Sequence, residues 1–368
     1  QYEADDYAYE MDKPAVQMFD VIAVGDIPPN GIVFQNRFTN GAKYANISGA
    51  VNPTHPGRVY VDLSTPIPSA ESARGGLTPK QYFYRHYLEG LDQVYFKTYI
   101  DLTDKRARSS DYVAGYAEFQ PSSSTYDVLA DNQGNLSMAY LTLKEVPLQD
   151  PSFGENVHPF SRAALDFLKL NRSELVHGYD PNQSDPGNFM DQIGNLLGTT
   201  FQFFREISIM AAGFNRYAYR QGWGLVIELN GRTVVRLKNG EGKMYGGGSR
   251  GIRLSLSDEW THGLGAEEYG QQFDYTIEEE GRTISSGVAI TPQGLGGDES
   301  ALLYPVDYQL SNPLSASQNL FVEKPMMNGY YPGPSGGYRR VMVRSLADQQ
   351  GVDIDESYAP ITVHEFYT

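Results

Sequence analysis

One stretch of the chain has the residue types of a metal-dependent peptidase. It reads Asp258-Glu-Trp-Thr-His262-Gly-Leu-Gly-Ala-Glu-Glu268. Zinc peptidases place His-Glu-x-x-His on a helix, because that spacing puts two imidazoles and a general base on one face. Here Asp258 stands in place of the first histidine, and a third ligand would be Glu268. We therefore expect a polar loop between strands, and the hypothesis of a degenerate metallopeptidase depends on Asp258, His262 and Glu268.

Two glycine-rich segments could bind ions. Gly246-Gly-Gly-Ser-Arg250 lacks the Lys-Ser or Lys-Thr pair of a phosphate loop, and a strand pattern follows it. This segment predicts a bulge or a close backbone approach within a sheet. Gly294-Leu-Gly-Gly-Asp-Glu299 offers oxygen ligands for calcium without the spaced aspartates of a dedicated loop. We expect no cofactor and no metal, and the question of calcium near Gly294–Glu299 stays open.

Other catalytic patterns are missing from the sequence. There is no cysteine, the six histidines show no pairing at ligand spacing, and no Gly-x-Ser-x-Gly elbow occurs. The tyrosine- and glycine-rich run that ends at Tyr338 could present a carbohydrate or peptide platform, although most tyrosines in such sheets serve packing. We therefore predict no enzymatic activity and no catalytic residues.

The composition restricts the partners. The net charge of −16 opposes binding to nucleic acid and to anionic membrane surfaces. No apolar run is long enough to span a bilayer. The chain has 38 Gly, 21 Pro and 27 Tyr, which is typical of a strand- and turn-rich protein. Because Gln1 stands where a Met is usual, we expect a processed product or a piece of a larger polypeptide.

The elements that would carry these residues fall into four ranges. Residues 1–20 are acidic and aperiodic and predict an extended arm that wraps a neighbour. Residues 21–147 predict a β-sandwich or meander, in which Val94, Phe96, Thr98 and Ile100 share one face. Residues 148–222 predict a two-helix spine, and 223–368 an antiparallel sheet. The predicted fold is mainly β with a small α part.

Local signals refine this picture. Ser161 is the expected N-cap of the first helix, which carries Ala164, Leu165 and Leu168, and a longer helix is expected over 185–214. Asn230-Gly231 predicts a hairpin between two strands, and Gly281 predicts a second hairpin. Two further strands are expected at 339–344 and 361–367.

Several motifs of the C-terminal part also resemble a known class of proteins. They are Arg232 to Arg250, Tyr269-Gly-Gln-Gln-Phe-Asp-Tyr-Thr, Thr283-Ile-Ser-Ser-Gly-Val-Ala, Gly296-Gly-Asp-Glu, Tyr331 to Ser345, and Val363-His-Glu-Phe-Tyr-Thr. In this order they resemble a segment of very large secreted or surface proteins of Bacteroidota, which are distantly similar to the Rhs/YD-repeat class. The resemblance implies long β-sheets that wind into a hollow shell around a delivered, often toxic, domain. It carries over no catalytic residues.

The leading hypothesis is therefore a non-enzymatic structural section of a giant exported protein, secreted or at the cell surface. Its partners would be other segments of the same polypeptide, an enclosed cargo domain, or protein secretion machinery. The alternatives are a self-assembling subunit of a capsid, pilus or injection particle, and the degenerate zinc metallopeptidase.

Overall fold

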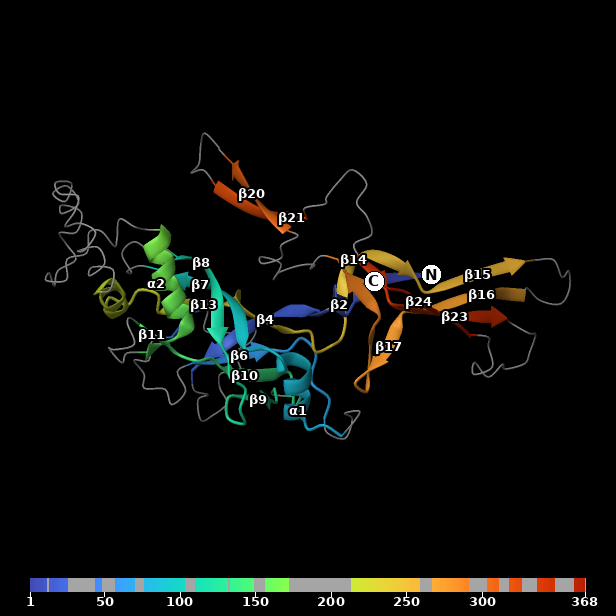
Figure 1. Cartoon of the computed structure of the whole chain (residues 1–368), viewed down its shortest axis with the longest axis horizontal. Coiled ribbons are helices and arrows are strands. Elements are labelled where there is room, and N and C mark those ends of the chain that lie inside the picture. Colours follow the sequence, from blue (N-terminus) through green and yellow to red (C-terminus); the bar gives the residue numbers. More distant parts are fainter. Residues whose placement is uncertain are drawn as a thin grey trace. The chain divides into compact units, whose positions relative to one another are not determined.

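A computed structural model describes residues 1–11, 13–25, 44–47, 57–69, 76–102, 110–131, 133–148, 156–171, 213–258, 267–290, 303–310, 318–325, 336–347 and 361–367. Strands, most of them antiparallel, dominate these residues, and the helices are short. The predicted fold class, mainly β with a small α part, is confirmed (Figure 1). No helix within this part of the chain is long and apolar enough to cross a membrane.

Two compact units divide the chain. One unit combines Gln1–Gln17 with Lys238–Thr368, and the other comprises Met18–Leu237. We call them the terminal unit and the central unit. The expected ranges divide the chain differently, since the arm at 1–20 and the sheet region at 223–368 each contribute to both units.

One large sheet forms the central unit. Its strand order is β8-β7-β13-β4-β6-β10-β9, and β5 pairs with β13. The strands are β4 Val16–Val24, β5 Tyr44–Asn46, β6 Arg58–Asp62, β7 Gln93–Asp101, β8 Ser110–Glu118, β9 Tyr126–Leu129, β10 Met138–Thr142 and β13 Val226–Lys238. The remaining elements are α1 Pro79–Phe83, the π-helical turn Tyr84–Leu88, the short pair β11 Val146–Pro147 and β12 Asn156–Val157, and α2 Pro159–Asn171.

The core of the central unit lies between the sheet and α2. Val94, Phe96, Thr98 and Ile100 of β7 are all buried, as their alternation predicts. The Phe96 ring packs against Phe160 at the start of α2, with the ring centroids 4.4 Å apart. The apolar period of two along β7 therefore identifies the covered face of the sheet correctly.

The helix α2 starts earlier than predicted. It begins at Pro159, and Ser161, the expected N-cap, is its third residue and fully buried. The backbone N–H of Phe160 donates to Nδ1 of His158 over 3.2 Å, so the imidazole takes the role of a cap acceptor. Ala164, Leu165 and Leu168 are buried as expected. The correction arises because proline is favoured in the first helical position, which moves the N-cap three residues upstream, from Ser161 to His158.

Burial lowers the pKa of His158 to about 3. In the unfolded chain the imidazole titrates near its ordinary 6.5, so below that pH the unfolded state binds one proton more than the folded state. We expect the free energy of unfolding to fall by about 2 kcal/mol from this residue between pH 7 and pH 5. Urea unfolding at both pH values measures the loss. The variant His158→Asn keeps a hydrogen-bond acceptor and should reduce the slope of the free energy of unfolding against pH. An unchanged slope in that variant would contradict the assignment.

The predicted hairpin at Asn230-Gly231 is wrong. The two residues lie inside one continuous strand, β13, whose pairing with β7 shifts register between Glu228 and Thr233. Gly231 takes a positive φ of 77° there, which glycine adopts without strain. The Oγ1 of Thr233 donates to the carbonyl oxygen of Glu228 over 2.7 Å, across the shift. The Asn-Gly signal therefore marks a β-bulge and not a chain reversal.

The terminal unit contains several smaller sheets. They are β1-β14, β15-β16-β23-β24, β17-β18, β22-β19-β2-β3 and β20-β21. Their bounds are β1 Tyr2–Tyr7, β2 Tyr9–Glu10, β3 Lys13–Pro14, β14 Met244–Gly251, β15 Arg253–Asp258, β16 Glu267–Asp274, β17 Thr276–Glu279, β18 Arg282–Ser285, β19 Gly287–Ala289, β20 Leu303–Leu310, β21 Gln318–Pro325, β22 Gly336–Tyr338, β23 Arg340–Ala347 and β24 Ile361–Glu365.

The structure settles three expectations about this unit. The hairpin at Gly281 is confirmed, because β17 pairs with β18 across Glu280 and Gly281, both at positive φ. The strands β23 and β24 are confirmed and pair with each other. The arm is strand rather than a loose wrap around a neighbour, since β1 pairs antiparallel with β14 of the same chain.

Most of the helix expected over 185–214 lies outside the described residues, and 213–220 are helical.

Candidate functional site

The residues of the peptidase-like motif lie in strands where the structure describes them. Asp258 is the last residue of β15 and pairs with Glu267, while Glu268 pairs with Ser257. His262 and the possible calcium ligands of 294–299 fall outside the described residues. The helical spacing that would bring the first ligand position beside a histidine does not apply to Asp258, because its backbone is a strand. Within the described part of the chain, no group of three His, Asp or Glu side chains could hold a metal ion.

A different cluster, centred on Arg250, gathers the polar side chains of the terminal unit. Arg250 on β14 faces β1, where its Nη1 and Nη2 donate to the two carboxylate oxygens of Asp6 over 2.6 and 2.9 Å. Its Nε donates to Glu3 over 2.7 Å. The side chains of Arg250 and Asp6 are only 10% and 12% exposed. This paired geometry is the strongest that a guanidinium and a carboxylate form.

Two tyrosine rings complete the surroundings of the guanidinium. Its Cζ lies 4.6 Å from the ring centroid of Tyr275 and 5.3 Å from that of Tyr338, and Nη1 also donates to the Tyr338 hydroxyl over 3.3 Å. The two centroids are 4.6 Å apart. Desolvation by burial raises the pKa of both phenols, so they stay neutral at physiological pH. The Tyr275 hydroxyl can therefore donate to the carbonyl of Gly251 over 2.7 Å.

The glycine run of β14 fits a close approach by the arm. The pairing of β1 with β14 shifts register between Ala4 and Asp6, where Asp5 alone lies opposite residues 246–248, so the bulge is in the glycine run of β14. The Oδ1 of Asp5 accepts the backbone N–H of Gly248 over 2.8 Å. A Cβ added to Gly246 would lie 2.6 Å from that same oxygen. The prediction of a bulge or close backbone approach at Gly246–Arg250 is therefore confirmed.

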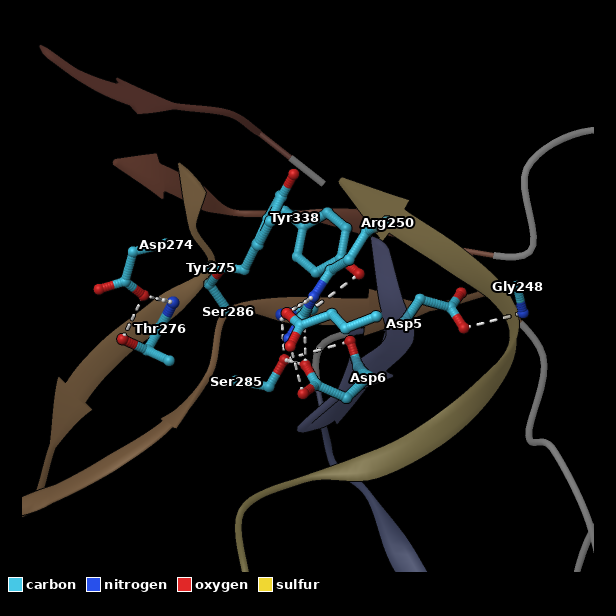
Figure 2. A network of polar contacts seen from close by, with 12 residues as sticks. Asp5, Asp6, Gly248, Arg250, Asp274, Tyr275, Thr276, Ser285, Ser286 and Tyr338 are labelled. Carbon is cyan, nitrogen blue, oxygen red and sulfur yellow. Dashed lines mark hydrogen bonds and ion pairs between the residues drawn. The ribbon is translucent and has the colours of Figure 1, made fainter. Parts of the chain in front are cut away.

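Hydroxyl groups tie the cluster to the neighbouring strands (Figure 2). The Ser285 Oγ donates to the carboxylate of Asp6, and the Ser286 Oγ donates to the carbonyl of Arg340 over 2.6 Å. Asp274 accepts from the backbone N–H and the hydroxyl of Thr276 over 2.8 and 2.7 Å, which fixes the step from β16 to β17. Four sequence segments remote from one another thus meet at one guanidinium.

An open cleft of about 500 Å³ lies beside the cluster. Its polar lining residues are Glu3, Asp6, Glu241, Lys243, Arg250, Gln272, Asp274, Thr276, Thr283 and Ser285. Four of the five N–H donors of Arg250 already have protein acceptors, so the guanidinium has little capacity left to bind an anion. Chemically, the cluster is best suited to joining strands.

Sequence reasoning singled out the segments of four of the six side chains that form this cluster. The segments of Arg250, Tyr275, Ser285 and Tyr338 all belong to the motifs singled out above, whereas Glu3 and Asp6 of the arm were not connected with them. The only available signal was the acidic, tyrosine-rich composition of the first residues of the chain. Comparisons of the chain with protein-family models, with curated proteins and with solved structures find no match.

Proposed function

We propose that this chain is a non-enzymatic structural section of a larger exported protein, held at the cell surface or secreted. One observation carries the proposal: four of the motifs that resemble large Bacteroidota surface proteins contribute residues to one cluster, which consists of Arg250, Tyr275, Ser285 and Tyr338 with Asp6 of the arm. Their conspicuous polar and aromatic side chains make contacts within the terminal unit. Because their hydrogen-bonding capacity is used by partners within the protein, we infer that these side chains stabilise the fold and have no catalytic role.

The arm connects the start of the chain to a strand that is far away in sequence. Asp6 and Arg250 are 244 residues apart in sequence, and β1 and β14 pair along their length. Such a closure joins the first and the later strands of the terminal unit in one structure. In a longer polypeptide, the proposed partners are its other segments, including an enclosed cargo domain, and the secretion machinery that exports it.

Incubation of the purified chain with a fluorogenic peptide library tests the non-enzymatic part of the proposal. We expect no hydrolysis above the buffer rate, with or without added zinc. Hydrolysis that a chelator abolishes, and that is lost in His262→Ala, would instead support the metallopeptidase.

Protease treatment of intact cells of the producing bacterium tests the location. We expect fragments of this chain to be released from the cell surface or found in the medium. Protection of the chain until the cells are lysed, with a cytoplasmic control protein equally protected, would overturn the proposed location.

A further inference from the structure

The N-terminal arm supplies much of the interior of the terminal unit. The part of the arm that belongs to this unit is Gln1–Gln17. In the described residues it contributes to two small apolar clusters, one formed by Ala8, Tyr9, Ile284 and Val288, the other by Tyr7, Ala15 and Ala289. At least half of the buried side chains in each cluster come from the arm. Without an arm, the later strands of the unit would expose these apolar surfaces to water.

Two strands from the later part of the chain receive the arm, and we call β14 and β19 the acceptor strands. The arm strand β1 pairs antiparallel with β14, and β2 pairs parallel with β19. The backbone N–H groups of Ala8 and Met11 donate to the carbonyl oxygens of Gly287 and Ala289 over 3.0 and 2.9 Å. The arm is therefore bound mainly as an added strand, a mode in which main-chain hydrogen bonds supply affinity and side-chain contacts supply specificity.

The acceptor strands fit the sequence of this arm. Arg250 on β14 donates to both carboxylate oxygens of Asp6. The glycine run of β14 admits Asp5, because a Cβ at Gly246 would lie 2.6 Å from the Oδ1 of Asp5. On β19, a Cβ at Gly287 would lie 2.1 Å from the carbonyl oxygen of Asp6. The acidic residues of the arm thus meet one cation and two glycines, and the arm of a second copy reproduces every one of these matches.

The order of the chain gives the arm an opportunity to reach a second copy. The whole central unit, Met18–Leu237, separates the arm from the acceptor strands in sequence. Ribosomes add about 5 to 20 residues per second, so an arm is made about ten seconds or more before its own acceptor strands. During this interval Tyr7 and Tyr9, which are buried in the folded unit, lack their apolar partners. A neighbouring chain that is already complete offers the same groups to the arm.

We propose that the acceptor strands bind the arm of a second copy of this chain, and that two copies exchange arms reciprocally to form a dimer. An exchanged arm makes the same contacts as an arm seated within one chain, which is why domain swapping is a low-cost route to dimers. The net charge of −16 does not prevent the exchange, because physiological salt largely screens charges of two copies that lie more than about 8 Å apart. The exchange gives the proposed scaffold a defined partner, another copy of itself.

Two full-length variants whose charges match only after exchange test this proposal. Asp6→Arg places an arginine opposite Arg250 of the same chain, and Arg250→Asp places an aspartate opposite Asp6 of the same chain. Each variant repels its own arm, whereas a mixed dimer with exchanged arms pairs opposite charges at both sites. We expect each variant alone to be monomeric and the two variants, when co-expressed, to form a mixed dimer. Size-exclusion chromatography with light scattering measures the mass.

A covalent readout shows whether the arm lies on the other copy. The chain has no cysteine, and Ala4 and Ser249 are exposed and directly paired between β1 and β14. Ala4→Cys is added to Asp6→Arg, and Ser249→Cys to Arg250→Asp. Mild oxidation should link the two chains at least about tenfold more than in a control pair that carries Ser255→Cys instead of Ser249→Cys, because only the paired positions are held together. Ser255 is also exposed but lies on β15.

Chains that carry only the cysteine substitutions repeat the test without charge reversal, so a folding defect of the charge variants does not decide the outcome. We expect Ala4→Cys and Ser249→Cys chains to become linked here too, in smaller yield, because each arm also closes on its own chain. The proposal is overturned if neither background gives interchain disulfide above the Ser255→Cys control. It is also overturned if the co-expressed charge variants stay monomeric while circular dichroism shows both to be folded.

Discussion

Arg250→Ala is expected to lower the free energy of unfolding by about 3 to 5 kcal/mol, the usual cost of removing one partner of a buried ion pair. The loss follows from the desolvation of Asp6, whose side chain is 12% exposed and would keep its charge without the paired donors. The rings of Tyr275 and Tyr338 would also lose the cation that both of them contact. Arg250→Lys should recover only part of the stability, because an ammonium cannot bind both carboxylate oxygens in the same way.

Urea unfolding and hydrogen exchange measure this effect together. The backbone amides of β1 that pair with β14 should exchange faster in Arg250→Ala than in the parent, because the arm is held by this pair. Lys144→Ala breaks an ion pair in which both side chains are about half exposed, and it should cost less than about 1 kcal/mol. The double variant Asp6→Ala/Arg250→Ala should be more stable than Arg250→Ala alone. Equal losses in Arg250→Ala and Lys144→Ala would show that the cluster does not hold the arm.

Local patterns predicted the strands of this chain better than their partners. The period of two in β7 identified its buried face, and the turn residues before Arg282 identified a true hairpin. At Asn230-Gly231 the same kind of signal was misleading, because positive φ serves a bulge as well as a turn. Whether a strand reverses or continues depends on β7, which pairs on both sides of the bulge and lies more than a hundred residues earlier.

The Arg250 cluster illustrates a second limit. The motif segments around Arg250 and Tyr275 were recognised as strands, and the glycine run was correctly interpreted as a close backbone approach. The approaching residue, Asp5, could not be inferred, since nothing local to the arm specifies the register of β1 on β14. The cation that a carboxylate will contact cannot be predicted from the sequence, because the pairing of distant strands brings the two together.

Gly287→Ala is the second substitution for which we expect a large loss of stability, about 3 kcal/mol, at the upper end of the range for overpacking. Gly287 is the first residue of β19, and its carbonyl accepts the backbone N–H of Ala8 over 3.0 Å. A Cβ at this position would lie 2.1 Å from the carbonyl oxygen of Asp6 and 2.9 Å from the Cα of Tyr7. Both are backbone atoms, so no side-chain rotation can relieve the overlap.

The clash at Gly287 can be relieved only if the arm moves away from β19, which would also strain the contacts of Asp6 with Arg250 and Ser285. Gly251→Ala is the matched control, because a Cβ there has no atom within 4 Å and this glycine has no positive φ. Thermal and urea unfolding of the two variants should therefore differ clearly, with Gly251→Ala within about 1 kcal/mol of the parent. If Gly287→Ala were as stable as Gly251→Ala, the arm could not be packed against β19 as closely as this structure requires.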